Sequence, residues 1–113
     1  MSKRQQKIDL YTNDIREKLG FEPNIDLLTK VTIGCGPAIY LKDAETVAGT
    51  DQAELETVKK NFLVKKLGLK DGPELDKAIG EVMEQYGKSN RNKYRAVVYY
   101  LLTLKFKKES VYK

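Results

Sequence analysis

Hydrophobic residues in the first third of the chain recur at intervals of three and four, which is the spacing of one helix face. The first series predicts a helix over residues 5–19 and comprises Ile8, Tyr11, Ile15 and Leu19. Gly20 follows directly and favours the end of that helix, because glycine readily adopts the left-handed conformation found there. Asn24 is a good N-cap for a second helix, whose apolar face comprises Ile25, Leu28 and Val31.

Glycine and proline divide the middle of the chain. The run Gly34-Cys35-Gly36-Pro37 predicts a sharp break after the second helix. Pro37 suits the first position of a short element over residues 38–42, because its fixed φ and missing N–H cost nothing there. A single helical turn is expected over residues 43–49.

Two longer helices are expected to follow. Thr50 or Asp51 caps the first of them, and Gly68 ends it. Pro73 opens the second, and Gly87 closes it. The expected buried faces are Leu55, Val58, Phe62 and Leu63 in the first helix, and Leu75, Ile79, Val82, Met83 and Tyr86 in the second.

The last helix is predicted to lie at the centre of the protein, with Ser89 or Asn90 as its cap. Its apolar stripe comprises Tyr94, Val97, Val98, Leu101 and Leu102, widened by Tyr99, Tyr100 and Leu104. The β-branched and aromatic residues over 97–102 would also suit a strand. The length of the segment and its flanking caps favour a helix, and no second strand-like run exists to pair with it.

The pattern as a whole predicts an all-α protein. We expect residues 1–113 to form a single compact domain of five or six short helices around a central C-terminal helix. The ends, residues 1–4 and 108–113, are expected to be frayed.

Composition fits this reading and excludes several classes of function. The chain has 113 residues, 33% of them charged and 41% apolar, which is ordinary for a globular domain. It contains no His, so the commonest acid/base group and the commonest metal ligand are both missing. One Cys cannot form an internal disulfide or a multi-cysteine zinc site. We therefore expect no enzymatic activity, no metal and no cofactor.

The chain is also expected to be cytoplasmic. Its longest apolar run, residues 96–102, is far shorter than the ~20 residues that cross a bilayer. The basic residues near the N-terminus are not followed by an apolar stretch, so no secretory signal is predicted. A single thiol is consistent with a reducing compartment.

Positive charge is concentrated in the last quarter of the chain. The formal net charge is +5, yet residues 88–113 hold eight basic residues against one acidic residue, Glu109. Residues 1–87 are therefore slightly acidic. The basic segment is the strongest candidate binding surface, with Lys88, Ser89, Asn90, Arg91, Lys93 and Arg95 as possible anion- or partner-binding residues.

Three interpretations of this basic segment stay open. Its charges can pair with carboxylates of the acidic region, bind a protein partner or a second copy of the chain, or contact nucleic acid. Cations at a helix start oppose the helix dipole, which indicates that something anionic compensates them. An exposed Tyr99 or Tyr100 would favour self-association.

The turn Gly34-Cys35-Gly36-Pro37 also allows two interpretations. It resembles the helix-hairpin-helix turn that offers backbone amides to DNA phosphates, but Tyr40 stands where a small residue is preferred. The alternative is a tight structural turn whose glycines permit positive φ. Cys35 is either a partly buried structural residue or a redox-sensitive thiol, and no His is present to activate it.

Carboxylates are the remaining candidates for catalysis. The pairs Asp43 with Glu45 and Asp51 with Glu54 stand where helix caps and exposed first turns require acidic residues. A capping or solvated role accounts for them, so a non-enzymatic binding or structural module is the leading prediction.

Four long strings identify a family resemblance. They are LLTKVT at 27–32, KDAETV at 42–47, NFLVKKLGL at 61–69 and GKSNRNKYR at 87–95. Together they resemble the family catalogued as domain of unknown function 2853, and the likeness covers nearly the whole chain. The resemblance implies a small helical protein of the bacterial cytosol. It implies no activity, and no site residues can be carried over from it.

Overall fold

The protein is described by a computed structural model, which places residues 2–87 and 93–112. These residues contain six α-helices and no strand. The α-helices are α1 (Lys3–Asp14), α2 (Ile25–Gly34), α3 (Lys42–Glu45), α4 (Gln52–Thr57), α5 (Pro73–Tyr86) and α6 (Arg95–Lys105). The predicted all-α, single-domain architecture is therefore confirmed.

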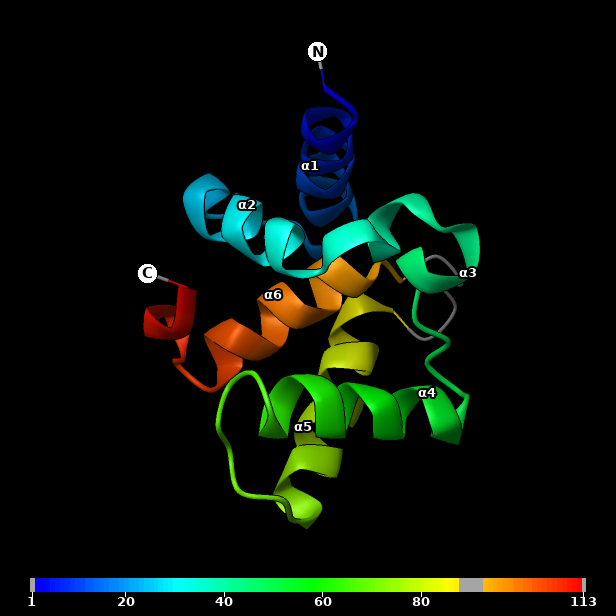
Figure 1. The fold of residues 1–113 in the computed structure, drawn as a ribbon, viewed down its shortest axis with the longest axis vertical. Helices are drawn as coiled ribbons and strands as arrows, with labels where there is room; N and C mark the ends of the chain where they lie inside the picture. The colour runs from blue at the N-terminus through cyan, green and yellow to red at the C-terminus, as the bar shows by residue number, and fades with distance from the viewer. Residues whose placement is uncertain (1, 88–92, 113) are drawn as a thin grey trace.

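Helix α6 runs through the middle of the molecule, with α1, α2 and α3 on one side and α4 and α5 on the other (Figure 1). It packs directly against α2 and α5. Its buried residues are Ala96, Val97, Val98, Tyr100, Leu101, Leu102 and Thr103. The predicted central position of the last helix is confirmed, because an 11-residue helix buried on most of its faces needs cover on all sides.

The predicted capping residues begin and end several helices. The Asn24 side chain accepts a hydrogen bond from the N–H of Leu27, at 3.1 Å, and so begins α2. Asp51 begins α4 in the same way, by accepting from the N–H of Ala53. Gly20 has a φ of +74°, as expected of a glycine that ends a helix in the left-handed conformation.

Two helices continue into wider π-helical turns that the sequence pattern does not predict. Helix α1 continues as the π-helix η1 (Ile15–Leu19), and α4 continues as the π-helix η3 (Val58–Val64). A π-helix hydrogen-bonds from residue i to i+5 rather than i+4, and such turns occur mostly as short insertions within α-helices. The predicted helix that Asp51 caps is thus α4 and η3 together.

The region between α2 and α4 differs in detail from the expected elements. The 3-10 helix η2 (Gly36–Tyr40) begins with Pro37 in its first turn, two residues earlier than the expected element at 38–42. The helical turn expected over 43–49 is the four-residue α3, which ends at Glu45. It ends early because Thr46 and Val47 are extended and pair with the chain before α6.

The start of α6 is later than predicted. Ser89 and Asn90 lie outside the described residues, and the helix begins at Arg95 with Tyr94 as its N-cap. Thr46 and Tyr94 form an isolated antiparallel bridge, and the N–H of Val47 donates to the carbonyl of Lys93 at 2.8 Å. Because this extended pairing occupies residues 93 and 94, neither of them can be helical.

Tyrosine hydroxyl groups join α6 to the rest of the core. The Tyr86 hydroxyl, at the end of α5, donates to the Asp14 carboxylate and accepts from the N–H of Tyr94. The Tyr100 hydroxyl accepts from the N–H of Asn24, at 2.8 Å. Both hydroxyls satisfy backbone groups at the start of a helix, and so fix α6 relative to α2 and α5.

Helices lie close to both ends of the described chain. Lys3 already lies in α1, which Ser2 caps. Near the other end, the 3-10 helix η4 (Glu109–Tyr112) packs against α2. Tyr112 is 8% exposed and lies close to Gly34, where an added Cβ would stand 3.3 Å from its ring. Residues 109–112, which were expected to be frayed, thus form a short helix whose Tyr112 side chain packs apolar area against α2.

The buried face of α2 differs from the predicted one at one position. Ile25 was expected on the buried face of α2 but is 44% exposed, and Leu27 is buried in its place.

Among the described residues, no helix has the length and apolar character needed to span a membrane.

Truncation of a fully buried side chain on α6 should strongly destabilise the protein. Leu102 is 0% exposed, so we expect Leu102→Ala to lower the free energy of unfolding by about 2–5 kcal/mol through lost burial and cavity formation. Urea denaturation measures this change. Leu41→Ala is the matched control, because Leu41 is 57% exposed and its truncation should change little. Equal effects of the two substitutions would contradict the central position of α6.

Candidate functional site

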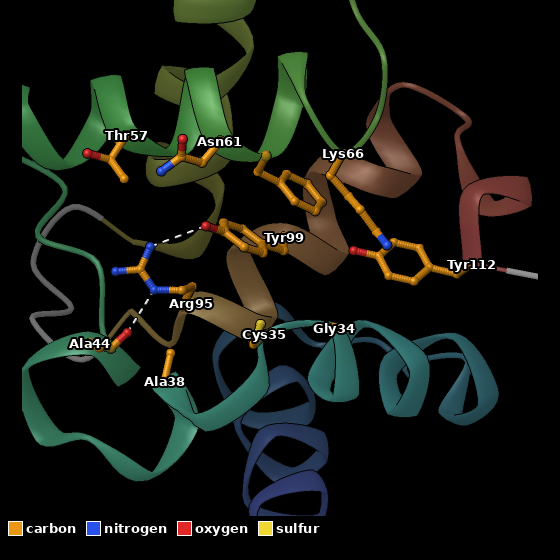
Figure 2. A pocket seen from close by; sticks show the side chains of 11 residues that line it. Gly34, Cys35, Ala38, Ala44, Thr57, Asn61, Lys66, Arg95, Tyr99 and Tyr112 are labelled. Atoms are coloured by element: carbon orange, nitrogen blue, oxygen red, sulfur yellow. Dashed lines mark hydrogen bonds between the residues drawn. The ribbon is translucent and has the colours of Figure 1, made fainter.

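A cleft of about 400 Å³ opens over the first half of α6 (Figure 2). One side is formed by small residues at the end of α2, in η2 and in α3: Gly34, Cys35, Ala38 and Ala44. The other side is formed by polar residues from α4 and from the chain that follows it: Thr57, Asn61 and Lys66. Arg95, Phe62, Tyr99 and Tyr112 complete the lining.

The Arg95 side chain is held in this cleft by three hydrogen bonds. Its Nε donates to the carbonyl of Ala44 at 2.7 Å, and one terminal nitrogen donates to the Tyr99 hydroxyl at 3.2 Å. The other terminal nitrogen donates to the Glu54 carboxylate, also at 3.2 Å. Arg95 therefore joins α3, α4 and α6, and its side chain is only 12% exposed.

The ion pair with Glu54 offsets the unfavourable position of the Arg95 cation at the start of a helix. Arg95 is the first residue of α6, where the positive end of the helix dipole repels a cation. The Glu54 carboxylate, whose side chain is 30% exposed, supplies a compensating negative charge. The prediction that an anionic group compensates the basic helix start is therefore confirmed for Arg95, and the compensating group belongs to the chain itself.

Aromatic rings form the back of the cleft. The rings of Phe62 and Tyr99 stack with their centroids 3.9 Å apart and their planes 10° from parallel. The Lys66 ammonium group lies 5.0 Å from the centre of the Tyr112 ring, within the range of a cation–π contact. Burial raises the pKa of Tyr99, so its hydroxyl keeps its proton and can donate as well as accept at neutral pH.

The opposite side of the cleft offers little side-chain bulk. Gly34 has no side chain, and those of Ala38 and Ala44 end at a methyl group. Cys35 is partly buried, and burial raises the pKa of its thiol to about 11. The thiol is consequently protonated near pH 7. Partial burial is in line with a structural cysteine, and a raised pKa is the opposite of what activates a thiol.

The cleft carries positive charge. Arg95 and Lys66 are its charged lining residues within the part of the chain that the structure describes, and no carboxylate lines it there. The charged lining of a second cleft, of about 670 Å³, is one lysine, Lys42, and four acidic residues, Asp43, Glu45, Asp51 and Glu54. Because Glu54 lines this second cleft and pairs with Arg95, the ion pair separates a basic cleft from an acidic one.

The predicted basic segment is only partly described. Lys88, Ser89, Asn90 and Arg91 lie outside the described residues, so their predicted binding role is not tested. Lys93 is 4% exposed, and its alkyl chain packs against Gly49. Arg95 turns into the cleft. The two described basic residues of the segment therefore do not form an open basic patch.

The Gly34–Pro37 segment is a tight link between α2 and η2. Gly36 has a φ of +64°, the left-handed conformation that favours glycine. A Cβ added at Gly34 would stand 3.3 Å from the Tyr112 ring, so a side chain there would require the ring to shift slightly. The conformation of Gly36 and the close contact of Gly34 therefore explain why glycine occurs at both positions, and the turn forms part of a cleft wall.

Tyr100 is buried and Tyr99 is stacked on Phe62, so neither provides the exposed aromatic face that would indicate self-association.

Three of the four candidate carboxylates, Glu45, Asp51 and Glu54, take structural roles. Asp51 caps α4, and Glu54 binds Arg95. Glu45 accepts from the Lys7 ammonium group at 2.8 Å and from the Tyr11 hydroxyl at 2.7 Å. Among the described residues, no group of three or more potential His, Cys, Asp or Glu ligands could hold a metal ion.

Six lining residues were given no candidate role from the sequence: Ala38, Ala44, Thr57, Asn61, Lys66 and Tyr112. Each is an ordinary residue of a helix face or a chain end, and no motif marks it. They come together because α3 and η2 form one side of the cleft, α4 and η3 form the other, and Tyr112 of η4 lies at the end far from Arg95 (Figure 2).

Comparison with known proteins places the chain in a family. The model of the family described as "Protein of unknown function (DUF2853)" matches residues 10–110, so the chain belongs to that family. No curated protein matches the sequence.

Replacement of Arg95 by lysine should show how much the hydrogen bonds of Arg95 contribute to the stability of the protein. Lysine keeps the charge but cannot reach three acceptors that lie in different directions. We expect Arg95→Lys to lower the free energy of unfolding by ~1–3 kcal/mol, measured by urea denaturation. Arg16→Lys is the matched control, because Arg16 binds Glu22 and Asn13 at the exposed surface. A loss no larger than that of the control would contradict the anchoring role.

The Cys35 thiol should react slowly in the native protein. With a pKa of about 11, against about 8.5 for an ordinary thiol, its thiolate fraction at pH 7.5 is smaller by a factor on the order of 100. We expect iodoacetamide to modify native Cys35 far more slowly than Cys35 of the urea-unfolded chain. Equal rates would show an accessible, unshifted thiol, and would favour the redox-switch alternative.

Proposed function

We propose that this member of the DUF2853 family is a non-enzymatic binding module, and that the cleft around Arg95 receives an anionic ligand. The observation that carries the proposal is the fixed Arg95 guanidinium group in a cleft that has a second cation, Lys66, and no carboxylate among its described lining residues. A ligand anion there would face two positive groups without direct repulsion from the lining.

The three anchoring bonds prepare Arg95 for binding rather than saturate it. They use one N–H from each of its three nitrogens, and a guanidinium group carries five N–H donors. One N–H therefore remains on each terminal nitrogen for a ligand acceptor. Because the side chain is already immobilised, a ligand would not have to order it, and the entropic cost of binding falls accordingly.

Several features favour binding over catalysis. The chain has no His, and the Cys35 thiol beside the cleft is held in its protonated form by burial. Glu54, the carboxylate nearest to Arg95 in its hydrogen-bond network, is engaged in an ion pair. The groups near the cleft are therefore suited to hold a ligand and lack an evident proton acceptor.

The other interpretations of the basic segment are less well supported. A nucleic-acid surface would need basic side chains directed outward, whereas Lys93 is buried and Arg95 faces the cleft. A protein partner or a second copy of the chain stays an alternative for the segment that begins at Lys88. The proposal includes a location in the bacterial cytoplasm, which the single thiol and the family resemblance support.

Nuclear magnetic resonance can test the cleft directly. We expect at least one of benzoate, inorganic phosphate and methanesulfonate to shift the backbone amide signals of Gly34, Ala38 and Ala44 saturably at constant ionic strength. Methylammonium, the cationic probe, should not. Affinities of about 1 mM are expected of such small probes.

Two variants test whether the positive charge of the cleft is responsible for this binding. Lys66→Gln should weaken binding, because it removes one of the two cations, while Lys65→Gln should not, because Lys65 is an exposed neighbour outside the lining. The proposal is wrong if none of the three anions shifts the cleft amides. Binding of DNA or RNA at about 50 mM salt, with shifts confined to residues outside the cleft, would favour the nucleic-acid alternative instead.

A further inference from the structure

We infer that the anion received by the Arg95 cleft is a small monocarboxylate that carries a flat aromatic ring. This inference rests on the proposed function and specifies its ligand. Three independent features of the cleft point to this chemical class: its charge balance, the geometry of its cation and the shape of its walls.

The charge balance favours a monoanion. The cleft has two cations, Arg95 and Lys66, but Glu54 already neutralises part of the charge of Arg95. These three groups together carry a formal charge of +1. A carboxylate, with a charge of −1, matches that value, whereas a phosphate monoester carries about −1.5 to −2 at pH 7. A doubly charged phosphate would leave negative charge close to Glu54.

The geometry of Arg95 suits a carboxylate as well. A planar guanidinium group with an N–H left on each terminal nitrogen can bind the two oxygens of one carboxylate. Thr57 and Asn61 lie across from Arg95 on the α4–η3 side of the cleft (Figure 2), and both are exposed. The Asn61 amide can donate a further hydrogen bond to a carboxylate oxygen, whereas the Thr57 hydroxyl already donates to the Ala53 carbonyl at 3.0 Å.

The walls of the cleft indicate a flat apolar body. On one side Gly34, Ala38 and Ala44 leave space where larger side chains would fill the cleft. At the back lies the stacked pair of Phe62 and Tyr99. A ring of the ligand can lie against this pair in an offset or edge-to-face arrangement, which aromatic groups favour.

The size of the cleft sets an upper limit on the ligand. Its volume of about 400 Å³ is near the small end of ligand-binding pockets, which suits a molecule with one ring and a short chain. Tyr112 lies at the far end from Arg95 and is held there by Gly34 and Lys66 (Figure 2). The carboxylate end and the ring end of a ligand therefore have distinct surroundings.

The experiment compares five probes by chemical-shift titration of the full chain. The probes are 3-phenylpropanoate, its neutral amide 3-phenylpropanamide, the ring-free acetate, inorganic phosphate and benzoate. We expect 3-phenylpropanoate or benzoate to bind at least about tenfold more tightly than the amide, acetate or phosphate. The largest shifts should fall on Gly34, Ala38, Ala44 and the Nε–H of Arg95.

A variant that blocks the space without changing charge completes the test. Ala38→Leu should weaken binding of the aromatic carboxylates at least about tenfold, whereas Ala53→Leu should not, because Ala53 is an exposed residue of α4 outside the lining. The same spectra show whether both variants are folded. If Ala38→Leu does not fold, Ala44→Leu takes its place.

The outcomes separate the two levels of the proposal. If phosphate or acetate binds in the cleft as tightly as the aromatic carboxylates, the ligand class inferred here is wrong and the anion-binding function stands. Equal binding of 3-phenylpropanamide and 3-phenylpropanoate also overturns the ligand class, because the charge of the probe would then contribute nothing. If none of the anions shifts the cleft signals, both the ligand class and the proposed function fail.

Discussion

The structure depends on the burial of α6. A helix whose residues Ala96 to Thr103 are almost all hidden must be enclosed by the other elements, and its first residue then emerges among them rather than at the surface. That residue is Arg95. Since its guanidinium group cannot be left buried without partners, it binds Ala44, Tyr99 and Glu54, and thereby fixes three separate parts of the chain relative to each other.

The cleft is a consequence of the same arrangement. The residues that face α6 from the end of α2, from η2 and from α3 are small, and they leave space beside Arg95 that the rest of the core does not fill. The opposite side belongs to α4 and η3, whose polar residues face the space instead of α6. A fixed cation, an aromatic surface and an open volume occur together, and this combination separates the site from an ordinary surface ion pair.

Most of the fold could be predicted from the sequence, because it is encoded locally. The face of α5 from Leu75 to Tyr86 follows helical periodicity, and Asn24 and Asp51 cap the helices they were expected to cap. The site could not be predicted, because it is not local. Arg95 was expected near the start of a helix capped by Ser89 or Asn90, and whether it pairs with a carboxylate was left open. The extended pairing of Lys93 and Tyr94 delays the helix start to Arg95, whose side chain lies in the cleft. No signal in the neighbourhood of Asn61 or Lys66 indicates that they lie across from it.

The most direct test of the anchoring of Arg95 is the exchange of its Nε proton with water, followed by nitrogen-15 resonance. Arg16 is the internal reference, because its side chain is 48% exposed and its Nε donates to Glu22 at the surface. Anchoring of Arg95 requires its Nε proton, bonded to the Ala44 carbonyl in a side chain that is 12% exposed, to exchange at least about tenfold more slowly than that of Arg16. Equal exchange rates for the two side chains would contradict it.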